Sequence, residues 1–285
     1  IGNKACKTPQ GRVISERCKG FWYTHPMQKL SIRNHKGLEM VVTVSIPKNP
    51  KGMAVTLHGL GGFKEQPHIM VLANTLFENG YTTINFDATN SIGESGGKYE
   101  DATMQSHYED LVDVISWTKT QAWYTEPFVL AGHSLGGYAV ARYAEEYPKE
   151  VRAVFPYALV VAGELSYRAH EMFEPQELKE WKESGWKIKR SVSKPGIIKR
   201  LPWSHMEERL KHDLRPHASK LTMPVLFVVG ENDKSCTSGN QEALYDLVLG
   251  PKEMHIISGA PHTFSERKHL KELGDIFNSW LIKLN

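Results

Sequence analysis

Short strand-forming runs alternate with helical runs along most of this 285-residue chain. Short runs of β-branched, aromatic and aliphatic residues predict strands, and longer runs with an apolar face of helical spacing predict helices. Strands are predicted at 28–33, 39–46, 53–57, 82–86, 128–131, 153–157, 225–229 and 253–257, and helices at 68–78, 104–119, 135–147, 240–249 and 266–284. The first two strands form a hairpin, whereas the later alternation is typical of parallel βαβ units. We therefore expect an α/β fold, a mostly parallel central sheet flanked by helices.

One long segment interrupts this alternation. Residues 163–218 show no strand–helix rhythm and are too many for a simple connection. The segment is also rich in basic side chains between Lys179 and Arg200. We expect it to be an inserted subdomain, which we call the cap segment (residues 163–218). The core then comprises residues 28–162 and 219–285, and residues 1–27 form an N-terminal extension.

Charge and hydropathy exclude two classes of partner. Lys and Arg number 35 against 32 Asp and Glu, a formal net charge of +3, and no basic stripe alternates with stacking aromatic residues, so we expect no nucleic-acid binding. The longest nearly uncharged apolar run, 153–163, has 11 residues, whereas a membrane-spanning helix needs about 20. We expect a soluble protein without a membrane span. The sequence leaves open whether the protein forms a homodimer.

The cysteines and the first residues bear on the cellular compartment. Three cysteines are too few for a disulfide framework; Cys6 and Cys18 would pair in an oxidising compartment, and two free thiols are the equal alternative. Residues 1–26 contain five basic side chains and no apolar run of the kind found in a secretory signal. We expect a cytoplasmic protein, with secretion left open because the chain starts at Ile1.

The strongest chemical signal is Gly132-His133-Ser134-Leu135-Gly136, which matches Gly-x-Ser-x-Gly. A predicted strand leads into this segment and a predicted helix follows it, which is the setting of a nucleophile elbow. Glycines suit such a tight turn because side chains there would collide with neighbouring backbone. The helix that follows points its amide groups at the place where an oxyanion would form. Ser134 is the predicted nucleophile.

A serine hydroxyl needs a base, which at neutral pH is usually a histidine. In folds of this kind the acid and then the histidine follow the serine along the chain. Asp233 lies just beyond strand 225–229 and His262 just beyond strand 253–257, where α/β sheets place their sites. We predict that His262 is the base and that Asp233 orients it. Glu231 is the competing acid.

The remaining histidines are given other roles. His133, inside the elbow, is expected to be a structural neighbour of the nucleophile, and His269 is expected on the solvent side of the terminal helix. His205, His212 and His217 have spacings that match no common metal site, so surface or capping roles are expected for them. No metal site is predicted.

The glycine-rich loop after strand 53–57 is the expected place of an oxyanion hole. We predict that the backbone N–H groups of Leu60 and Leu135 stabilise the oxyanion. Such a loop can also bind phosphate, but neither Gly-x-Gly-x-x-Gly nor a Walker-type Gly-Lys-Ser/Thr sequence is present.

Taken in their order along the chain, these motifs resemble those of the α/β-hydrolase superfamily. The resemblance covers about residues 28–285. Within it, the chain is most similar to the bacterial cinnamoyl (feruloyl) esterases and their serine-hydrolase relatives. The similar segments are 58–63, 85–97, 98–104 and 132–137. The resemblance implies that the inserted segment forms a lid over the acyl pocket.

Two positions depart from that family. Residues 90–95 replace a Gly-His-Gly-x-Ser sequence that many members carry near the site, and Leu135 stands where cinnamoyl esterases commonly have Gln. These departures bear on substrate preference and leave the triad intact.

The sequence thus predicts a serine carboxylic-ester hydrolase that forms an acyl-enzyme on a small-molecule ester and needs no cofactor. A peptidase or amidase and a monoacylglycerol-lipase-like hydrolase of the same fold are the alternatives, and a non-catalytic binding protein is disfavoured by the complete triad.

The apolar residues of the cap segment have two interpretations. They either pack the cap segment onto the core, or line the acyl side of the pocket through at least one tryptophan and Met172 or Phe173. The candidate pocket residues are Met172, Phe173, Trp181, Trp186 and Trp203.

Overall fold

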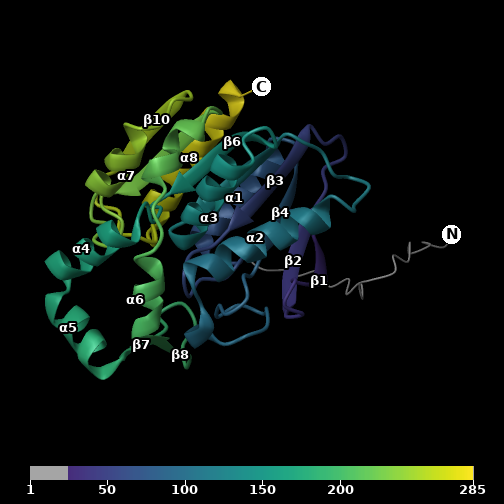
Figure 1. The fold of residues 1–285 in the computed structure, drawn as a ribbon. Coiled ribbons are helices and arrows are strands. Elements are labelled where there is room, and N and C mark those ends of the chain that lie inside the picture. Colours follow the sequence, from purple (N-terminus) through teal and green to yellow (C-terminus); the bar gives the residue numbers. More distant parts are fainter. Residues whose placement is uncertain (1–24, 285) are drawn as a thin grey trace.

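The computed structural model describes residues 25–284, in which an eight-stranded sheet lies between two layers of helices (Figure 1). Along the sheet the strands follow the order β1-β2-β4-β3-β5-β6-β9-β10; β1 and β2 are antiparallel to their neighbours and all later pairs are parallel. The predicted α/β fold with a mostly parallel sheet is confirmed. The strands are β1 (Gln28–Arg33), β2 (Glu39–Ser45), β3 (Gly52–Leu57), β4 (Tyr81–Phe86), β5 (Phe128–His133), β6 (Val151–Tyr157), β9 (Val225–Gly230) and β10 (Lys252–Ile257).

Residues 1–24 and residue 285 lie outside the described part of the chain. The predicted alternatives for Cys6 and Cys18, and most of the predicted N-terminal extension, therefore also lie outside it.

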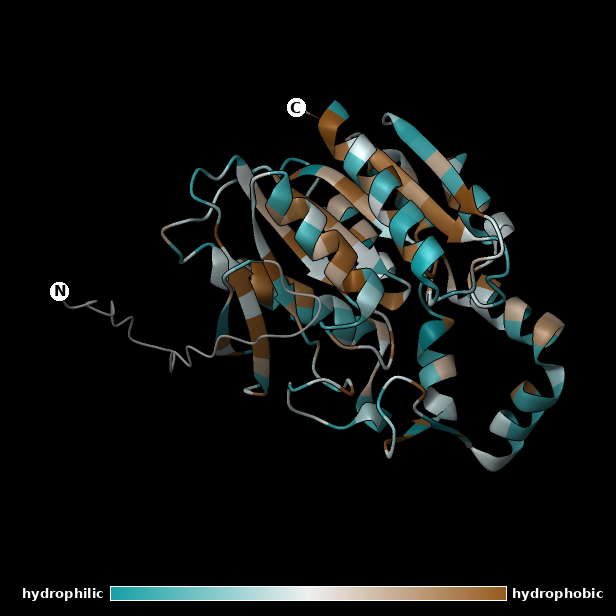
Figure 2. Ribbon diagram, turned by 180° about the vertical axis from the view of Figure 1, so that it is seen from behind, coloured by the Kyte–Doolittle hydropathy of each residue, from teal (hydrophilic) through white to brown (hydrophobic). Residues whose placement is uncertain are grey.

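Helices cover both faces of the sheet, and each face has its own apolar cluster. Successive side chains of a strand point to opposite faces, so Val55 and Leu57 of β3 join one cluster and Ala54 joins the other. Figure 2 shows the apolar strands enclosed between helices with hydrophilic outer sides. The first cluster is covered by α2 (Met104–Thr118), α3 (Leu135–Glu146) and α7 (Ser238–Tyr245), and the second by α1 (Pro67–Glu78) and α8 (Arg267–Lys283).

The expected exposure of His269 is wrong. This side chain is only 1% exposed, because α8 packs on α1 and the sheet along the face that carries Leu270, Leu273 and Phe277. His269 thus lies on the buried side of the terminal helix.

The cap segment is a small layer of its own beside the sheet (Figure 1). Strands β7 and β8 form an antiparallel hairpin that is separate from the main sheet. Its elements are α4 (Gly163–Phe173), α5 (Pro175–Ser184), β7 (Trp186–Arg190), β8 (Ile198–Pro202), α6 (Trp203–Arg209) and the 3-10 helix η2 (Arg215–Lys220); a second 3-10 helix, η1 (Tyr99–Asp101), precedes α2 in the core.

The two ends of this insertion lie side by side. Ala162 forms a β-bridge with Asp213, and the amide of Gly163 donates to the carbonyl of His212 at 2.9 Å. Beyond this point the chain is back in the core, since Leu214 and Ala218 belong to the main apolar cluster. The last residues of the cap segment therefore pack with the core.

The cap segment has a small apolar core. Leu178, Trp181, Leu201 and Met206 are buried together, and the Trp181 indole donates to the carbonyl of Leu201 at 3.1 Å. Outside this cluster, the Lys194 ammonium donates at 2.7 Å to the carbonyl of Ile92, in the segment that departs from the esterase pattern. The cap segment is thus fixed by its own packing and by contacts to the core loops.

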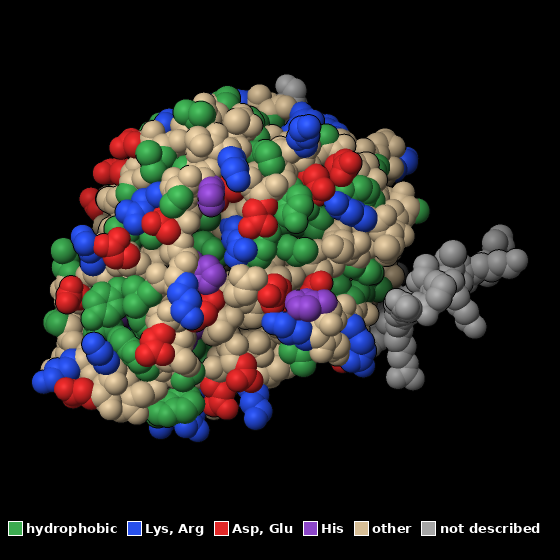
Figure 3. Space-filling view, in the orientation of Figure 1, with side chains coloured by type: hydrophobic (Ala, Val, Ile, Leu, Met, Phe, Trp, Pro, Cys, Tyr) green, Lys and Arg blue, Asp and Glu red, His purple; other side chains and the backbone are tan. Residues whose placement is uncertain are grey.

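Within residues 25–284, no helix combines the length and the apolar character needed to cross a lipid bilayer. On the face seen in Figure 3, lysine and arginine side chains are interspersed with acidic ones.

Candidate active site

Ser134 occupies a strained turn between β5 and α3. Its φ of 54° lies in the left-handed region that L-residues rarely adopt. The turn is closed by glycines: a Cβ on Gly132 would lie 2.3 Å from the carbonyl oxygen of Gly136, and a Cβ on Gly136 would lie 2.5 Å from that of His58. The predicted need for glycine at both positions is confirmed, and the geometry is that of a nucleophile elbow.

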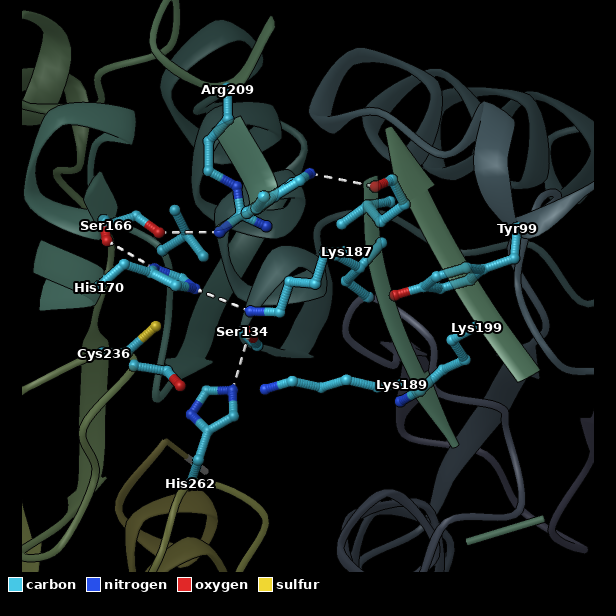
Figure 4. Close-up of a pocket in the computed structure, with 15 residues that line it drawn as sticks. Tyr99, Ser134, Ser166, His170, Lys187, Lys189, Lys199, Arg209, Cys236 and His262 are labelled. Carbon is cyan, nitrogen blue, oxygen red and sulfur yellow. Dashed lines mark hydrogen bonds between the residues drawn. The ribbon is translucent and has the colours of Figure 1, made fainter. Parts of the chain in front are cut away.

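The three residues expected to form a triad meet at the carboxyl ends of β5, β9 and β10. His262 Nε2 lies 3.0 Å from Ser134 Oγ, and His262 Nδ1 lies 2.7 Å from Asp233 Oδ2. Because a carboxylate accepts from Nδ1–H, Nε2 is left with a lone pair for the serine proton. Figure 4 shows His262 directed at Ser134 across the floor of the pocket.

The Asp233 carboxylate is buried and fixed from its other side. Its Oδ1 accepts from the backbone amides of Ser235 at 2.9 Å and Cys236 at 2.8 Å. These two hydrogen bonds set the direction in which Oδ2 faces the imidazole.

The competing acid, Glu231, has a different place. Its exposed carboxylate accepts from the amide of Gly259 at 2.8 Å and the hydroxyl of Ser258 at 2.9 Å, and the amide hydrogen bond lowers its pKa. Glu231 thus braces the loop that carries His262 and does not contact the imidazole.

His133 is a buried neighbour of His262. Its Nε2–H donates to the backbone carbonyl of His262 at 2.8 Å, and its ring lies 4.4 Å from that of His68 and 4.6 Å from that of His262. Burial holds the pKa of His133 well below its ordinary value. The side chain is neutral and supports the backbone of the loop that carries His262.

The backbone of the Gly59–Leu60 loop approaches Ser134 closely. A Cβ on Gly59 would lie 2.9 Å from Cβ of Ser134. The amides of Leu60 and Leu135 donate to no group among residues 25–284, and Leu60 lines the pocket beside Ser134. Two unused N–H donors near a serine are the arrangement expected of an oxyanion hole.

Two histidines that the sequence did not single out hold this loop. His58 accepts from the amide of Ala88 at 3.0 Å and donates through Nδ1 to the carbonyl of Gly59, while His107 donates to the carbonyl of His58 at 2.8 Å. Their roles depend on contacts between distant loops, so no local pattern could reveal them.

A pocket of about 250 Å³ opens beside Ser134 and His262. Its walls come from the core loops, including Leu60 and Val160, and from the cap segment, including Trp181 and Leu201. The site therefore combines a core that holds the reactive groups with an insertion that shapes the space in front of them.

Of the five candidate pocket residues, the structure brings one to the pocket. Trp181 lines it, whereas Trp203 does not and packs edge-on against Trp181 at 5.4 Å between ring centroids. Met172 is 74% exposed and Phe173 40%, because both lie on the outer face at the end of α4. Trp186 is 38% exposed and carries the Arg200 guanidinium 4.7 Å above its ring. The expected lining by Met172, Phe173, Trp186 and Trp203 is not observed.

Comparison with known proteins identifies the family. Residues 22–201 match the X-Pro dipeptidyl-peptidase (S15) family. The chain belongs to the S15 family. This family assignment differs in detail from the esterase resemblance, although both place the chain among α/β-hydrolases.

Two curated proteins are similar to this chain in sequence. An uncharacterised 31.7 kDa protein from the traX-finO intergenic region of Escherichia coli is 27% identical over 266 residues, which cover 82% of this chain and 92% of that protein. The mitochondrial palmitoyl-protein thioesterase ABHD10 of Mus musculus is 25% identical over 60% of this chain and 55% of its own length.

Solved structures show the same architecture. Est1E from Butyrivibrio proteoclasticus, determined with ferulic acid bound, superposes with a TM-score of 0.72 at 21% identity and covers 89% of this chain and 98% of its own. Mouse α/β-hydrolase domain-containing protein 10 gives a TM-score of 0.72 at 19% identity over 90% of this chain and 99% of its own. The predicted membership of the α/β-hydrolase superfamily is confirmed, and the protein is an enzyme, a hydrolase.

The pocket of this S15-family protein is basic, which the binding of an uncharged acyl group would not require. Lys187, Lys189, Lys199 and Arg209 line it, and no Asp or Glu among the described residues does so. The density of basic residues in the cap segment was visible in the sequence, but its direction toward the pocket depends on the β7–β8 hairpin and on α6.

Metal chemistry finds no support in the histidine clusters of the cap segment. Among residues 25–284, no group of three or more His, Cys, Asp and Glu side chains could hold a metal ion. His212, for example, is engaged by the Glu208 carboxylate at 2.6 Å and by the Tyr138 hydroxyl at 2.9 Å.

Proposed function

We propose that this protein is a serine hydrolase of carboxylic esters, with Ser134 as nucleophile, His262 as general base and Asp233 as the group that orients it. The observation that carries the proposal is the chain of two hydrogen bonds, Ser134 Oγ to His262 Nε2 at 3.0 Å and His262 Nδ1 to Asp233 Oδ2 at 2.7 Å, on the floor of a pocket. A cytoplasmic location and a homodimer stay predictions from the sequence.

In the proposed reaction, Ser134 Oγ attacks the ester carbonyl carbon while its proton passes to His262 Nε2. The carbonyl oxygen becomes an oxyanion that accepts from the amides of Leu60 and Leu135. His262 then returns the proton to the departing alcohol, and the acyl group stays on Ser134. Water attacks this acyl-enzyme with the same base and releases the acid.

A peptidase is the second candidate, because the family is named for X-Pro dipeptidyl-peptidases. A substrate recognised by a free peptide N-terminus brings an ammonium group. Such a group would meet Lys189, Lys199 and Arg209 and, among the described residues, no pocket-lining carboxylate. This charge distribution favours esters or thioesters over peptides bound by their N-terminus.

The test is active-site labelling combined with an ester panel. A fluorophosphonate should label the wild type, and Ser134→Ala should abolish labelling and lower kcat for p-nitrophenyl esters at least about a thousandfold. Far-UV circular dichroism and the melting temperature control for folding. Labelling that persists in Ser134→Ala would reject Ser134 as nucleophile. Faster turnover of an anilide than of the matched ester would favour the peptidase.

A further inference from the structure

Arg209, the last residue of α6, is a buried cation on the pocket wall. Its side chain is 7% exposed, and its hydrogen-bond partners are neutral. Nη1 donates to the hydroxyl of Ser166 at 2.8 Å and Nη2 donates to His205 Nε2 at 3.0 Å. Nε–H has no partner in the described part of the chain. The guanidinium thus retains free donors.

His205 is a neutral partner of this arginine. Its Nδ1–H donates to the carbonyl of Ala102 at 2.7 Å, which leaves Nε2 as a neutral acceptor, and burial lowers the pKa of His205 to about 3. Glu208, the residue before Arg209, forms no hydrogen bond with the guanidinium and accepts from the amides of Met104 and Gln105 at 3.0 Å each. Within residues 25–284, no carboxylate lies at ion-pair distance from Arg209.

The other pocket cations divide into a compensated pair and a single lysine. Lys187 and Lys189 reach Glu177 at 2.5 and 2.6 Å and share Glu174 at 3.8 Å, so two carboxylates face two ammonium groups. Lys199 forms no ion pair with any residue of 25–284, and a Cβ on Gly61 would lie 3.1 Å from Cδ of Lys199. The stem of Lys199 therefore lies against the loop that carries Leu60.

Figure 4 shows Lys199 and Arg209 on the walls of the space in front of Ser134 and His262. Arginine keeps its charge under burial, and a buried charge without a counter-ion is strongly unfavourable. A ligand carboxylate would supply the missing charge, because its two oxygens match the paired N–H groups of a guanidinium.

We propose that Arg209 binds a carboxylate of the substrate and that Lys199, on another wall of the pocket, adds positive charge to it, so that the preferred ester is an anionic one whose carboxylate lies beyond the scissile bond. This inference deepens the proposed ester hydrolysis and rests on it. It assigns Arg209 and Lys199 a role in substrate specificity that neither the family match nor the triad implies.

The test compares isosteric esters that differ in charge alone. For an acyl-side carboxylate, the pair is the p-nitrophenyl monoester of adipic acid and that of adipic monoamide. For a carboxylate on the leaving group, the pair is 4-acetoxybenzoate and 4-acetoxybenzamide. We expect kcat/KM to be at least about tenfold higher for the carboxylate in one of the two pairs. That pair identifies the side of the ester that faces Arg209.

Variants then locate the charge that gives this preference. Arg209→Met should lower the carboxylate-to-carboxamide ratio about tenfold or more, and Lys199→Met about threefold. Lys179→Met is the matched control, because Lys179 is an exposed cap-segment lysine that does not line the pocket. It should leave the ratio unchanged. A preference for the neutral ester in both wild-type pairs, or a ratio unmoved by Arg209→Met and Lys199→Met, overturns the proposal.

Binding provides a readout that does not need turnover. Calorimetric titration of Ser134→Ala with adipate and with 4-hydroxybenzoate should show binding that Lys199→Met weakens and Arg209→Met abolishes. If Arg209→Met does not fold, Lys199→Met and the wild-type ratios still decide. Failure of all esters and of fluorophosphonate labelling would reject the ester hydrolase, whereas absent carboxylate binding would reject the Arg209 site alone.

Discussion

Asp233 and Glu231 lie two residues apart in one loop, yet their carboxylates have separate tasks. Asp233 is buried against His262, and Glu231 binds the Ser258–Gly259 turn at the surface. The chain order of the triad singled out this loop, but it could not choose between the two acids on geometric grounds. The choice depends on which side chain turns inward, and the amides of Ser235 and Cys236 fix it.

This pair gives a prediction with a built-in control. Asp233→Asn should lower kcat for esters at least about a thousandfold, because an amide cannot stabilise the imidazolium and leaves His262 in the wrong tautomer. Glu231→Gln should retain activity within about threefold, since its contacts are to the loop only. Steady-state kinetics on a p-nitrophenyl ester, with melting temperatures, distinguishes the two. Comparable loss in both variants would show that Glu231 takes part in orienting the base.

Arg209 was missed because its place depends on contacts between segments that are distant in sequence. Ser134, His262 and Asp233, by contrast, lie at positions that local motifs and strand ends specify. Arg209 reaches the pocket only because α6 folds back beside α4, where Gly163 allows a close approach. A Cβ on Gly163 would lie 1.9 Å from the carbonyl oxygen of Arg209. Contacts of this kind join chain segments far apart in sequence and leave no periodic trace.

At the scale of elements, the sheet was more predictable than the cap segment. Every predicted core strand is present, and the differences are at the ends: β5 continues to His133, and β6 begins at Val151. Glycine and polar residues at these ends weaken the apolar pattern, although the backbone still pairs. The β7–β8 hairpin escaped prediction because its strands, such as Trp186–Arg190, alternate lysine with apolar residues that are mostly exposed.

The two faces of the cap segment should respond differently to mutation. Trp181→Ala removes a pocket wall and part of the small apolar core, so it should change the ratio of kcat/KM for a bulky aromatic and a short aliphatic ester about tenfold and also lower the melting temperature. Met172→Ala, at the exposed end of α4, should change neither. An unchanged ratio in Trp181→Ala, despite a lowered melting temperature, would make this tryptophan a packing residue only.

At the scale of the whole molecule, buried histidines link stability to pH. His68, His107 and His205 are almost fully buried, and burial lowers the pKa of each to about 3. Their pKa in the unfolded chain is about 6.5. Below that pH the unfolded chain takes up protons that the folded protein does not bind, so stability falls as pH drops from about 6.5 toward 3.

Each of these histidines should contribute up to about 1.4 kcal/mol of lost unfolding free energy per pH unit in that window. Urea unfolding at pH 7.5, 6.5 and 5.5, pH values chosen to span roughly the unfolded pKa, measures the slope. His107→Gln should reduce it by up to one proton, whereas His217→Gln, at an exposed position, should leave it unchanged. Equal slopes for wild type and His107→Gln would contradict the assignment of a neutral His107 in the fold.

The order of the strands also bears on how these molecules behave when crowded together. β1 and β10 stand at the two margins of the sheet, and an unpaired margin is a template for aggregation. Here β10 carries Lys252, Glu253 and His255, and Glu253 is held by Lys283 at 2.8 Å. A second chain that extended the sheet would have to strip water from these charges. The β10 margin thus opposes fibril-like growth.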